Sequence, residues 1–263
     1  MNHGLRYRSA PDRRARLLQI VEDQGFSSTI ELMEALGVSD MTVRRDAQKL
    51  AEDGRVRIVH GGVSLLPSAE LQGSREYEER AGLMAAAKVA LGRRASAGVQ
   101  DGQVIAIDAG TTGRELARAL SSRMEITVVT HSATVVADLM TRTSTSLVAL
   151  GGELHHETLS FAGPHIVEAI TELQLDTFFL TASGIGARGV FCANDFDAVT
   201  KRALIGIAAR VVLVVDSSKF HAPALVRVCD FSHVDEVIVD DGISAADRAI
   251  LAHAGVLVTV VSS

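Results

Sequence analysis

The spacing of apolar residues predicts three short helices near the start of the chain, over residues 12–24, 28–37 and 39–54. Each helix has one apolar face, and the three faces can pack together into a small core. The apolar positions are Leu17, Leu18, Ile20 and Val21, then Ile30, Leu32, Met33 and Leu36, then Val43, Ala47, Leu50 and Ala51. A short turn, Gly37-Val38, joins the second helix to the third, which is the helix-turn-helix pattern.

Several residues at the helix ends have the character of caps. Ser28-Thr29-Ile30-Glu31 has the form of a capping box. Ser39 is a good N-cap for the third helix because its hydroxyl can accept a bond from a first-turn amide, and Gly54 suits a left-handed stop. After Gly54, residues 55–59 alternate basic with apolar side chains and lead into His60-Gly61-Gly62. That pattern predicts a two-stranded ribbon, or wing.

A different pattern begins at Val104, where short apolar runs alternate with helical patterns. It predicts an α/β fold with a doubly wound, mostly parallel sheet covered on both faces. The strand-like runs are VIAID, ITVVT, SLVALGG, TFFLTAS, VVLVVD, EVIVDD and VLVTVV. The helical patterns between them cover residues 114–120, 132–140, 164–173, 198–208 and 245–254. Another helix is expected over residues 75–99, with Tyr77, Leu83, Val89 and Leu91 as apolar points.

These patterns divide the chain into domains over residues 11–66 and 88–263, joined by a linker and connecting helix over residues 67–87. The length of 263 residues is sufficient for two separate cores. No apolar run approaches the length of a membrane span, and the start of the chain lacks a signal-peptide pattern. Cys192 and Cys229 have no metal-binding spacing. We therefore expect a cytoplasmic protein with reduced thiols.

The third helix combines its apolar face with donor side chains off that face, at Thr42, Arg44, Arg45, Gln48 and Lys49. Arginine can pair with guanine edges, and either basic residue can hold phosphates. Arginines of the wing can reach a DNA backbone or a minor groove. The alternative is an ordinary amphipathic surface helix with solvated charges.

The net charge of −6 is unexpected for a protein that binds DNA. Residues 1–66 hold 10 Lys/Arg against 9 Asp/Glu, a net charge of +1, and the remainder holds 16 against 23, a net charge of −7. The first domain is therefore nearly neutral, with its basic residues gathered on the third helix and the wing. Such a protein depends on specific contacts and on pairing of two copies more than on bulk attraction to DNA.

A candidate anion site lies at Asp108-Ala109-Gly110-Thr111-Thr112, which follows a strand and opens a helix. Ligands of parallel sheets bind at the carboxyl ends of strands. Glycine allows close backbone approach, and the hydroxyls and free helix amides suit a phosphate. The alternative is that the threonines only cap the helix and Gly110 only forms the turn. A second set of candidate residues lies near other strand ends or on the predicted helix over residues 198–208. These are Gly151, Gly152, Ser183, Gly184, Lys201, Arg202, Asp216 and Lys219.

Residues 11–66 are similar to the winged helix-turn-helix domain of DeoR-type bacterial transcription regulators. The resemblance is carried by Arg13-Arg14, VSDMTVRRDAQKLAEDG and VRIVHGG. It implies that Thr42, Arg44, Arg45 and Lys49 face operator DNA. We expect Ser39, Arg57 and His60 to contact the DNA as well. Asp46 is not among these contacts, because it either orients Arg44 or Arg45 or balances charge within the domain.

Residues from about 88 to 242 resemble the effector-sensing domain of the same family, which is related in fold to sugar-phosphate isomerases and generally binds a phosphorylated sugar or related metabolite. The matching segments are Lys88, DGQVIAIDAGTT, ITVVTHS, VALGGEL, Asp176–Phe179, DAVTKRALI and VVDSSKF. The resemblance implies an effector site formed by Asp108, Gly110, Thr111, Thr112, Gly152, Lys201 and Lys219. His131 and Asp197 depart from the usual Asn and Glu, which bears on the identity of the effector.

The sequence thus predicts a DNA-binding transcriptional regulator, a repressor of carbohydrate-metabolism genes that a phosphorylated sugar or polyol modulates. As a two-fold oligomer, dimer or tetramer, it would bind operator half-sites about one helical turn apart, or a multiple of this. No cofactor, metal or membrane partner is expected. One alternative is a sugar-phosphate isomerase or deaminase carrying a DNA-binding domain, with Asp108, Asp197 and Asp216 as the candidate bases. Another is a constitutive DNA-binding protein with an inactive pocket.

Three further patterns are weaker. Gly184 to Gly189 fits G-x-G-x-x-G, but VFCAND follows it and does not begin a helix, so dinucleotide binding is not expected. His155-His156 has no third ligand at useful spacing. No Ser-His-Asp arrangement can be assembled from local motifs.

Overall fold

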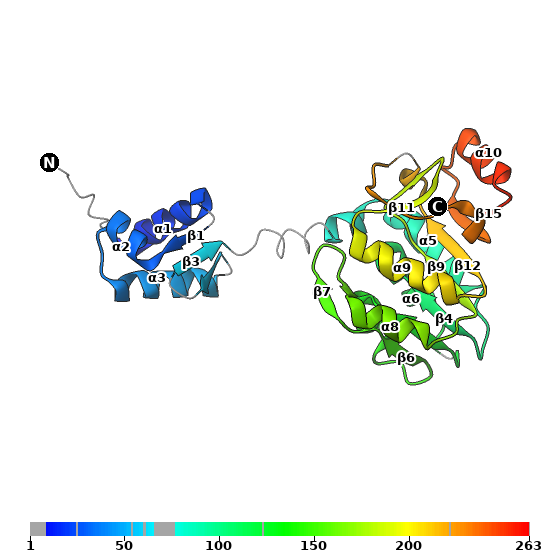
Figure 1. Ribbon diagram of the computed structural model, residues 1–263, viewed down its shortest axis with the longest axis horizontal. Coiled ribbons are helices and arrows are strands. Elements are labelled where there is room, and N and C mark those ends of the chain that lie inside the picture. The colour runs from blue at the N-terminus through cyan, green and yellow to red at the C-terminus, as the bar shows by residue number, and fades with distance from the viewer. Residues whose placement is uncertain are drawn as a thin grey trace. The chain divides into compact units, whose positions relative to one another are not determined.

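The computed structural model divides into two compact units, residues 1–72 and 73–263 (Figure 1). It describes residues 9–24, 26–53, 55–59, 62–65, 77–122, 124–220 and 222–262. The first part of the predicted linker, residues 67–76, lies outside these ranges.

The N-terminal unit packs three helices against a small antiparallel sheet with the strand order β1-β3-β2. The elements are α1 (Ala10–Gln24), β1 (Phe26–Ser28), α2 (Thr29–Leu36), α3 (Asp40–Glu52), β2 (Val56–Val59) and β3 (Gly62–Leu65). The buried core consists of Leu17, Leu18, Ile20, Val21, Leu32, Leu36, Val43, Ala47, Leu50, Val56 and Val63. The three predicted helices and the ribbon are confirmed. The three-residue β1 was not predicted, because it is too short to show a period.

The caps of this unit agree with the sequence only in part. Ser28 and Glu31 form the predicted capping box, and Gly37 ends α2 with a φ of 65°. Ser39 is the N-cap of α3, but its hydroxyl lies 3.0 Å from Thr42 Oγ1 and makes no bond to a helix amide. At the other end, α3 stops at Glu52 and its C-cap is Asp53, whose φ of −78° is not left-handed. The predicted stop residue, Gly54, lies outside the described residues. Ile30, predicted to be buried, is 68% exposed.

The C-terminal unit contains a seven-stranded sheet with the order β15-β14-β12-β9-β4-β5-β6. Every neighbouring pair of strands is parallel. The strands are β4 (Val104–Ile107), β5 (Thr127–Thr130), β6 (Ser146–Ala149), β9 (Thr177–Leu180), β12 (Val211–Val215), β14 (Glu236–Asp240) and β15 (Leu257–Val261). All seven predicted runs form this sheet.

Helices cover both faces of the sheet, as Figure 1 shows. They are α5 (Ala85–Ser96), α6 (Thr111–Ala119), α7 (Ala133–Leu139), α8 (Pro164–Thr171), α9 (Asp195–Ile207) and α10 (Ala245–His253). Neighbouring residues of β9 separate into two cores, since Phe178 packs with residues of α8, α9 and α10 and Phe179 with residues of α5, α6 and α7. The prediction of a doubly wound α/β sheet is confirmed.

Two small antiparallel sheets were not predicted. One pairs β7 (Glu153–His155) with β8 (Ser160–Ala162), and the other joins β10 (Gly184–Gly186), β11 (Gly189–Cys192) and β13 (Val226–Cys229). The G-x-G-x-x-G motif forms the β10–β11 hairpin, so no helix follows its glycines. Three-residue 3₁₀ turns, η1 (Ser217–Lys219) and η2 (Phe231–His233), follow β12 and β13.

The single helix predicted over residues 75–99 is wrong. Residues 77–82 are helical, residues 83–84 form a turn in which Met84 has a φ of 54°, and α5 then begins at Ala85. Tyr77 and Leu91 are buried, whereas Leu83 in the turn is 61% exposed. Among the described residues, no helix has the length and apolar character needed to cross a membrane.

Candidate DNA-binding helix and effector cavity

The polar side of α3 carries most of the residues predicted to bind DNA. Arg44, Arg45 and Lys49 are exposed, and Thr42 is partly exposed. Arg44 Nε lies 2.8 Å from Asp40 Oδ2 and Lys49 Nζ lies 3.1 Å from Glu52 Oε2. Exposed pairs of this kind contribute little stability, so both basic groups can exchange their carboxylates for phosphates. Of the remaining predicted contacts, Ser39 is exposed at the start of α3, while the side chain of Arg57 and all of His60 lie outside the described residues.

Asp46 has a structural position instead. Its side chain is buried, and Arg13 Nε donates to it across the contact between α1 and α3. The carboxylate therefore balances charge within the domain, which is one of the two alternatives left open by the sequence. It fixes the helix that carries Arg44 and Arg45 against the rest of the unit.

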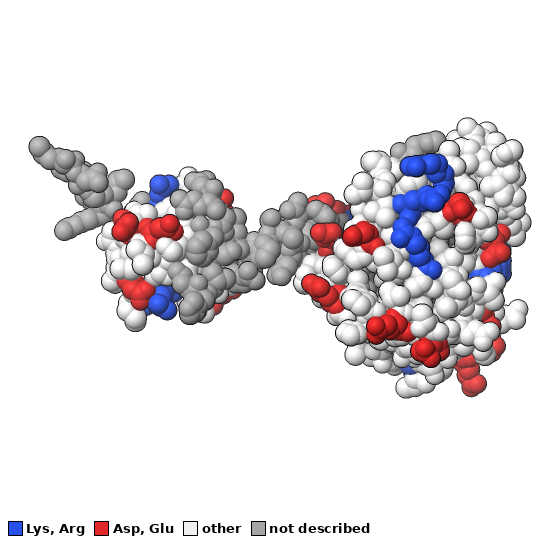
Figure 2. Space-filling view, in the orientation of Figure 1, with Lys and Arg blue, Asp and Glu red and all other residues white. Residues whose placement is uncertain are grey.

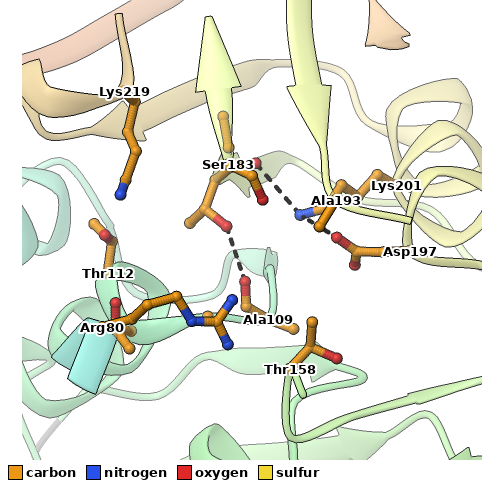
Figure 3. Close-up of a pocket in the computed structure, with 13 residues that line it drawn as sticks. Arg80, Ala109, Thr112, Thr158, Ser183, Ala193, Asp197, Lys201 and Lys219 are labelled. Carbon is orange, nitrogen blue, oxygen red and sulfur yellow. Dashed lines mark hydrogen bonds and ion pairs between the residues drawn. The ribbon is translucent and has the colours of Figure 1, made fainter. Parts of the chain in front are cut away.

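A cavity of about 200 Å³ opens at the carboxyl edge of the large sheet (Figure 3). Its walls come from the segments that follow the adjacent strands β4, β9 and β12, together with the first turn of α6. The lining residues are Arg80, Ala109, Gly110, Thr111, Thr112, Thr158, Thr181, Ala182, Ser183, Ala193, Asp197, Lys201 and Lys219. This is the position where open parallel sheets bind ligands.

One end of the cavity is suited to an anion. Gly110 precedes α6 with a φ of 121°, and no side-chain hydrogen bond caps the helix. The threonines therefore do not serve as the cap, which was the alternative to an anion site. The first-turn amides of a helix have no partner within the helix, and the helix dipole favours negative charge there. Figure 3 shows Lys219 extending toward Thr112 at this end, while the Arg80 side chain extends toward Ala109 and Thr158.

The floor of the cavity is a buried charged cluster. Asp108 Oδ2 accepts bonds from Lys201 Nζ and, at 2.8 Å each, from the backbone N–H and the hydroxyl of Thr181. Asp108 Oδ1 accepts the Ala109 N–H at 2.9 Å. Lys201 Nζ also lies 3.4 Å from Asp197 Oδ2, one helical turn away on α9. The cluster thus connects β4, β9 and α9 beneath the cavity.

The charges of this cluster stabilise one another. Burial lowers the pKa of Lys201, but the attraction of Asp108 and Asp197 outweighs burial and raises that pKa above its ordinary value. Burial raises the pKa of Asp197, but Lys201 and His131 outweigh burial and lower it. Both groups are therefore charged at neutral pH.

Most of the predicted effector residues lie together. Gly110, Thr111, Thr112, Lys201 and Lys219 line the cavity, and Asp108 lies directly beneath it. Gly152 does not line it. A Cβ atom at Gly152 would lie 2.5 Å from the carbonyl oxygen of Ala162, so this glycine permits close approach of the chain to β8.

Sequence reasoning missed Arg80, Thr158 and Thr181, and it noted Ser183 only as a strand-end residue. Thr181 and Ser183 follow β9, so the rule that ligands bind at the carboxyl ends of strands could have identified them. Arg80 carried no comparable signal, because the turn at Met84 that separates its helical segment from α5 is not visible in the apolar pattern.

Arg80 is held by several contacts. Its guanidinium donates to the carbonyl oxygen of Glu157, and its own carbonyl accepts a bond from Lys88 Nζ. Burial of Lys88 lowers the pKa of that amine to about 8. Tyr77, three residues before Arg80, is fully buried and its hydroxyl lies 2.9 Å from Thr134 Oγ1. The segment that follows the linker is therefore fastened to the sensor unit next to the cavity.

Comparison with known protein families assigns both units. Residues 13–69 match the model of the DeoR-like helix-turn-helix domain, and residues 84–241 match that of the DeoR C terminal sensor domain. The chain belongs to the DeoR family. It is accordingly a DNA-binding transcriptional regulator with a sensor domain, and the cavity lies in that sensor domain.

Relatives of the regulator match it over most of their length. The glycerol-3-phosphate regulon repressor of Escherichia coli K12 is 33% identical over 225 residues, which cover 85% of this chain and 88% of that protein. An HTH-type transcriptional regulator of Haemophilus influenzae is 30% identical over 245 residues, covering 93% and 95%. Among solved structures, ribose 5-phosphate isomerase A from Methanocaldococcus jannaschii matches with a TM-score of 0.37 and 20% identity, covering 51% of this chain and 53% of that one.

Proposed function

We propose that this DeoR-family protein represses genes of carbohydrate metabolism and that a phosphorylated sugar or polyol in the cavity releases it from DNA. The observation that carries the proposal is the lining of the cavity. Lys219 extends toward the start of α6 at one end, Arg80 adds a second basic group to the lining, and hydroxyl and carboxylate groups face the remainder. A ligand with a phosphate at one end and hydroxyls along its chain matches both the basic and the hydroxyl-lined parts of the cavity.

The size of the cavity favours a small metabolite. Its volume of about 200 Å³ is below the range of roughly 300–1,000 Å³ that is usual for pockets holding drug-sized molecules. Thr158, Ser183 and Asp197 can exchange hydrogen bonds with hydroxyl groups. A relative with the name glycerol-3-phosphate regulon repressor supports the same chemical class.

Arg80 supplies a route from the cavity to the DNA-binding domain. A phosphate that binds the Arg80 guanidinium competes with its bond to the Glu157 carbonyl and changes the contacts of residues 77–82. This segment leads directly into the linker. An effector can change DNA affinity only if it binds the two states of the protein with different affinity, and Arg80 is placed to make that difference.

Binding to an operator in the proposed way requires two copies of the chain. The first domain has a net charge of only +1, and each chain has a single α3 to place in a major groove. Two chains bound to paired half-sites would bind the operator more tightly than one chain. Figure 2 shows Asp and Glu side chains distributed over the visible face of the C-terminal unit, beside one band of Lys and Arg. The acidic surplus of this unit disfavours contact with DNA outside the α3 face. The protein acts in the cytoplasm, where the operator and the metabolite are both present.

The alternative of a sugar-phosphate isomerase is less compatible with the cluster. A general base near neutral pH needs a pKa close to that pH. The carboxylate of Asp108 already accepts four hydrogen bonds, and Lys201 and His131 lower the pKa of Asp197. Turnover measured on a panel of sugar phosphates separates the alternatives, since a regulator binds one of them without converting it.

The decisive experiment is a gel shift with DNA from upstream of the protein's own gene, with and without the same panel. We expect one compound to release the DNA. The variants Arg80→Met and Lys219→Met should bind the DNA normally and lose the response, whereas Arg188→Met, an exposed arginine outside the cavity lining, should retain it. If no compound affects either DNA binding or thermal stability, the pocket is inactive and the protein is a constitutive DNA-binding protein.

A further inference from the structure

Beneath the cavity, three side chains that are potential metal ligands converge. His131 follows β5, Asp108 follows β4 and Asp197 lies in the first turn of α9. His131 Nε2 is 3.6 Å from Asp108 Oδ1 and 3.7 Å from Asp197 Oδ1. One ligand atom from each of the three residues lies within 4.8 Å of the other two.

This cluster is buried and incompletely bonded. His131, Asp108 and Asp197 are 1%, 0% and 7% exposed. Within the described part of the chain, both ring nitrogens of His131 and the Oδ1 atom of Asp197 have no hydrogen-bond partner. Buried polar atoms normally have partners, so these three atoms are available to coordinate a bound ion.

Lys201 does not supply the missing contact. Its ammonium bonds the Oδ2 atom of Asp108 and lies beside the Oδ2 atom of Asp197, whereas His131 faces the Oδ1 atoms of both carboxylates. Two buried carboxylates face a single lysine ammonium, so one negative charge has no lysine or arginine partner within this cluster. Such a charge is costly without compensation, and the place for a compensating cation is the space between the Oδ1 atoms and Nε2.

The spacing of these atoms fits metal coordination. Separations of 3.6 and 3.7 Å exceed the length of a hydrogen bond, which is about 2.7–3.2 Å. They are close to the separation of about 3.4 Å between two ligands of a tetrahedral zinc ion with bonds of about 2.1 Å. Imidazole nitrogen and carboxylate oxygen are both ordinary zinc ligands.

We propose that His131 Nε2, Asp108 Oδ1 and Asp197 Oδ1 bind a divalent transition-metal ion of the zinc class. The fourth coordination position is taken by water or by a ligand oxygen, and Asp197, which also lines the cavity, connects the ion to it. A doubly charged ion together with Lys201 leaves the cluster with a charge of +1, which favours an anionic fourth ligand. The site depends on the imidazole of His131 and does not rest on the effector proposed above.

The first test is metal binding by the complete chain without an affinity tag, after removal of metal with a chelator. Titration with Co²⁺ should give one equivalent per chain and the intense visible absorption bands of tetrahedral cobalt. Zn²⁺ should displace the cobalt and raise the Tm, since a ligand bound only to the folded state stabilises it. Binding should weaken as the pH falls and protons compete for the imidazole.

The variants locate the site. His131→Asn should reduce metal affinity at least a hundred-fold, and Asp197→Asn should do the same if the first variant fails to fold. The matched control is His165→Asn, because His165 is an exposed histidine whose Nδ1 lies 3.5 Å from Glu168 Oε2. Its removal should leave binding unchanged. Binding of less than one-tenth of an equivalent of Co²⁺ by the native chain overturns the site. An equal loss of metal affinity in the His165 variant overturns it as well.

Discussion

Helix α3 and the floor of the sensor-domain cavity both pair basic with acidic side chains, but in opposite environments. On α3, Arg44 and Lys49 meet carboxylates one helical turn away, and all four groups remain 44–69% exposed. On the cavity floor, Lys201 and Asp108 come from residues 93 apart in the sequence and are at most 2% exposed.

This difference assigns the two sets of charges to different tasks. Exposed ion pairs contribute about 0–1 kcal/mol and can be replaced by phosphates without loss of structure. Buried pairs are strongly coupled, so removing one member leaves a charge that cannot be solvated. The exposed α3 charges are available to an external partner, which we propose is DNA, whereas the charges of the floor hold the sensor domain in the shape that forms the cavity.

The largest effect is expected from Lys201→Met. Removing the ammonium leaves Asp108 and Asp197 buried without their cation, and this should lower the free energy of unfolding by about 3–5 kcal/mol. Urea unfolding followed by circular dichroism measures the change. Lys49→Met is the surface control and should change it by less than about 0.5 kcal/mol. Equal effects of the two substitutions would remove the distinction between the two sites.

A second prediction concerns Asp46, the buried member of the α1–α3 pair. Asp46→Asn should lower the free energy of unfolding by about 1–3 kcal/mol, because Arg13 loses its charged partner in a half-buried position. Asp40→Asn, which removes the exposed partner of Arg44, should have little effect on stability. A loss in the Asp40 variant as large as that in the Asp46 variant contradicts the structural role given to Asp46.

DNA affinity, unlike stability, should depend on the exposed charges of α3. Arg45→Ala should cost about 1–3 kcal/mol of discrimination at one base pair if the guanidinium reads a base edge, with stability unchanged. Lys49→Ala should instead weaken binding to all sequences and reduce the salt dependence by about one counterion. Fluorescence anisotropy over a range of salt concentrations distinguishes the two. If both variants lose the same affinity for every DNA sequence, both side chains contact phosphates.

The same contrast explains which features the sequence predicted. The polar face of α3 arises from residues close together in the chain, so helical spacing alone places Arg44, Arg45 and Lys49 together. The seven strands were equally visible as apolar runs. The cavity floor joins Asp108, His131, Thr181 and Lys201 from four separate segments, and only the rule about strand ends brings some of them near one another.

Other features depended on tertiary contacts with no local signal. Arg80 reaches the cavity because the chain turns at Met84, a residue with positive φ that sequence patterns do not favour there. Gly152 was assigned to the effector site, yet its glycine is required by the approach of the Ala162 carbonyl. Ser39 was expected to cap an amide and instead bonds Thr42.

The smallest predicted effect is a pH dependence from Lys88. Burial lowers its pKa from 10.5 to about 8 in the folded protein, so between these values the unfolded chain binds more protons. Stability should therefore rise with pH across this interval, by on the order of 1 kcal/mol relative to Lys88→Met. Chemical unfolding of both proteins at pH 7.5 and 9.5 measures the difference. A parallel response of the two proteins shows that Lys88 does not titrate in this range.

The proposed function depends on coupling between ligand binding in the cavity and DNA binding by the N-terminal domain. The most direct test measures operator affinity with and without the sugar phosphate that most raises the Tm, and the affinity for that compound with and without operator. We expect a loss of 5- to 150-fold in DNA affinity and the same factor in the affinity for the compound, because linkage is reciprocal. Saturating binding of the compound in the cavity with DNA affinity unchanged contradicts this coupling.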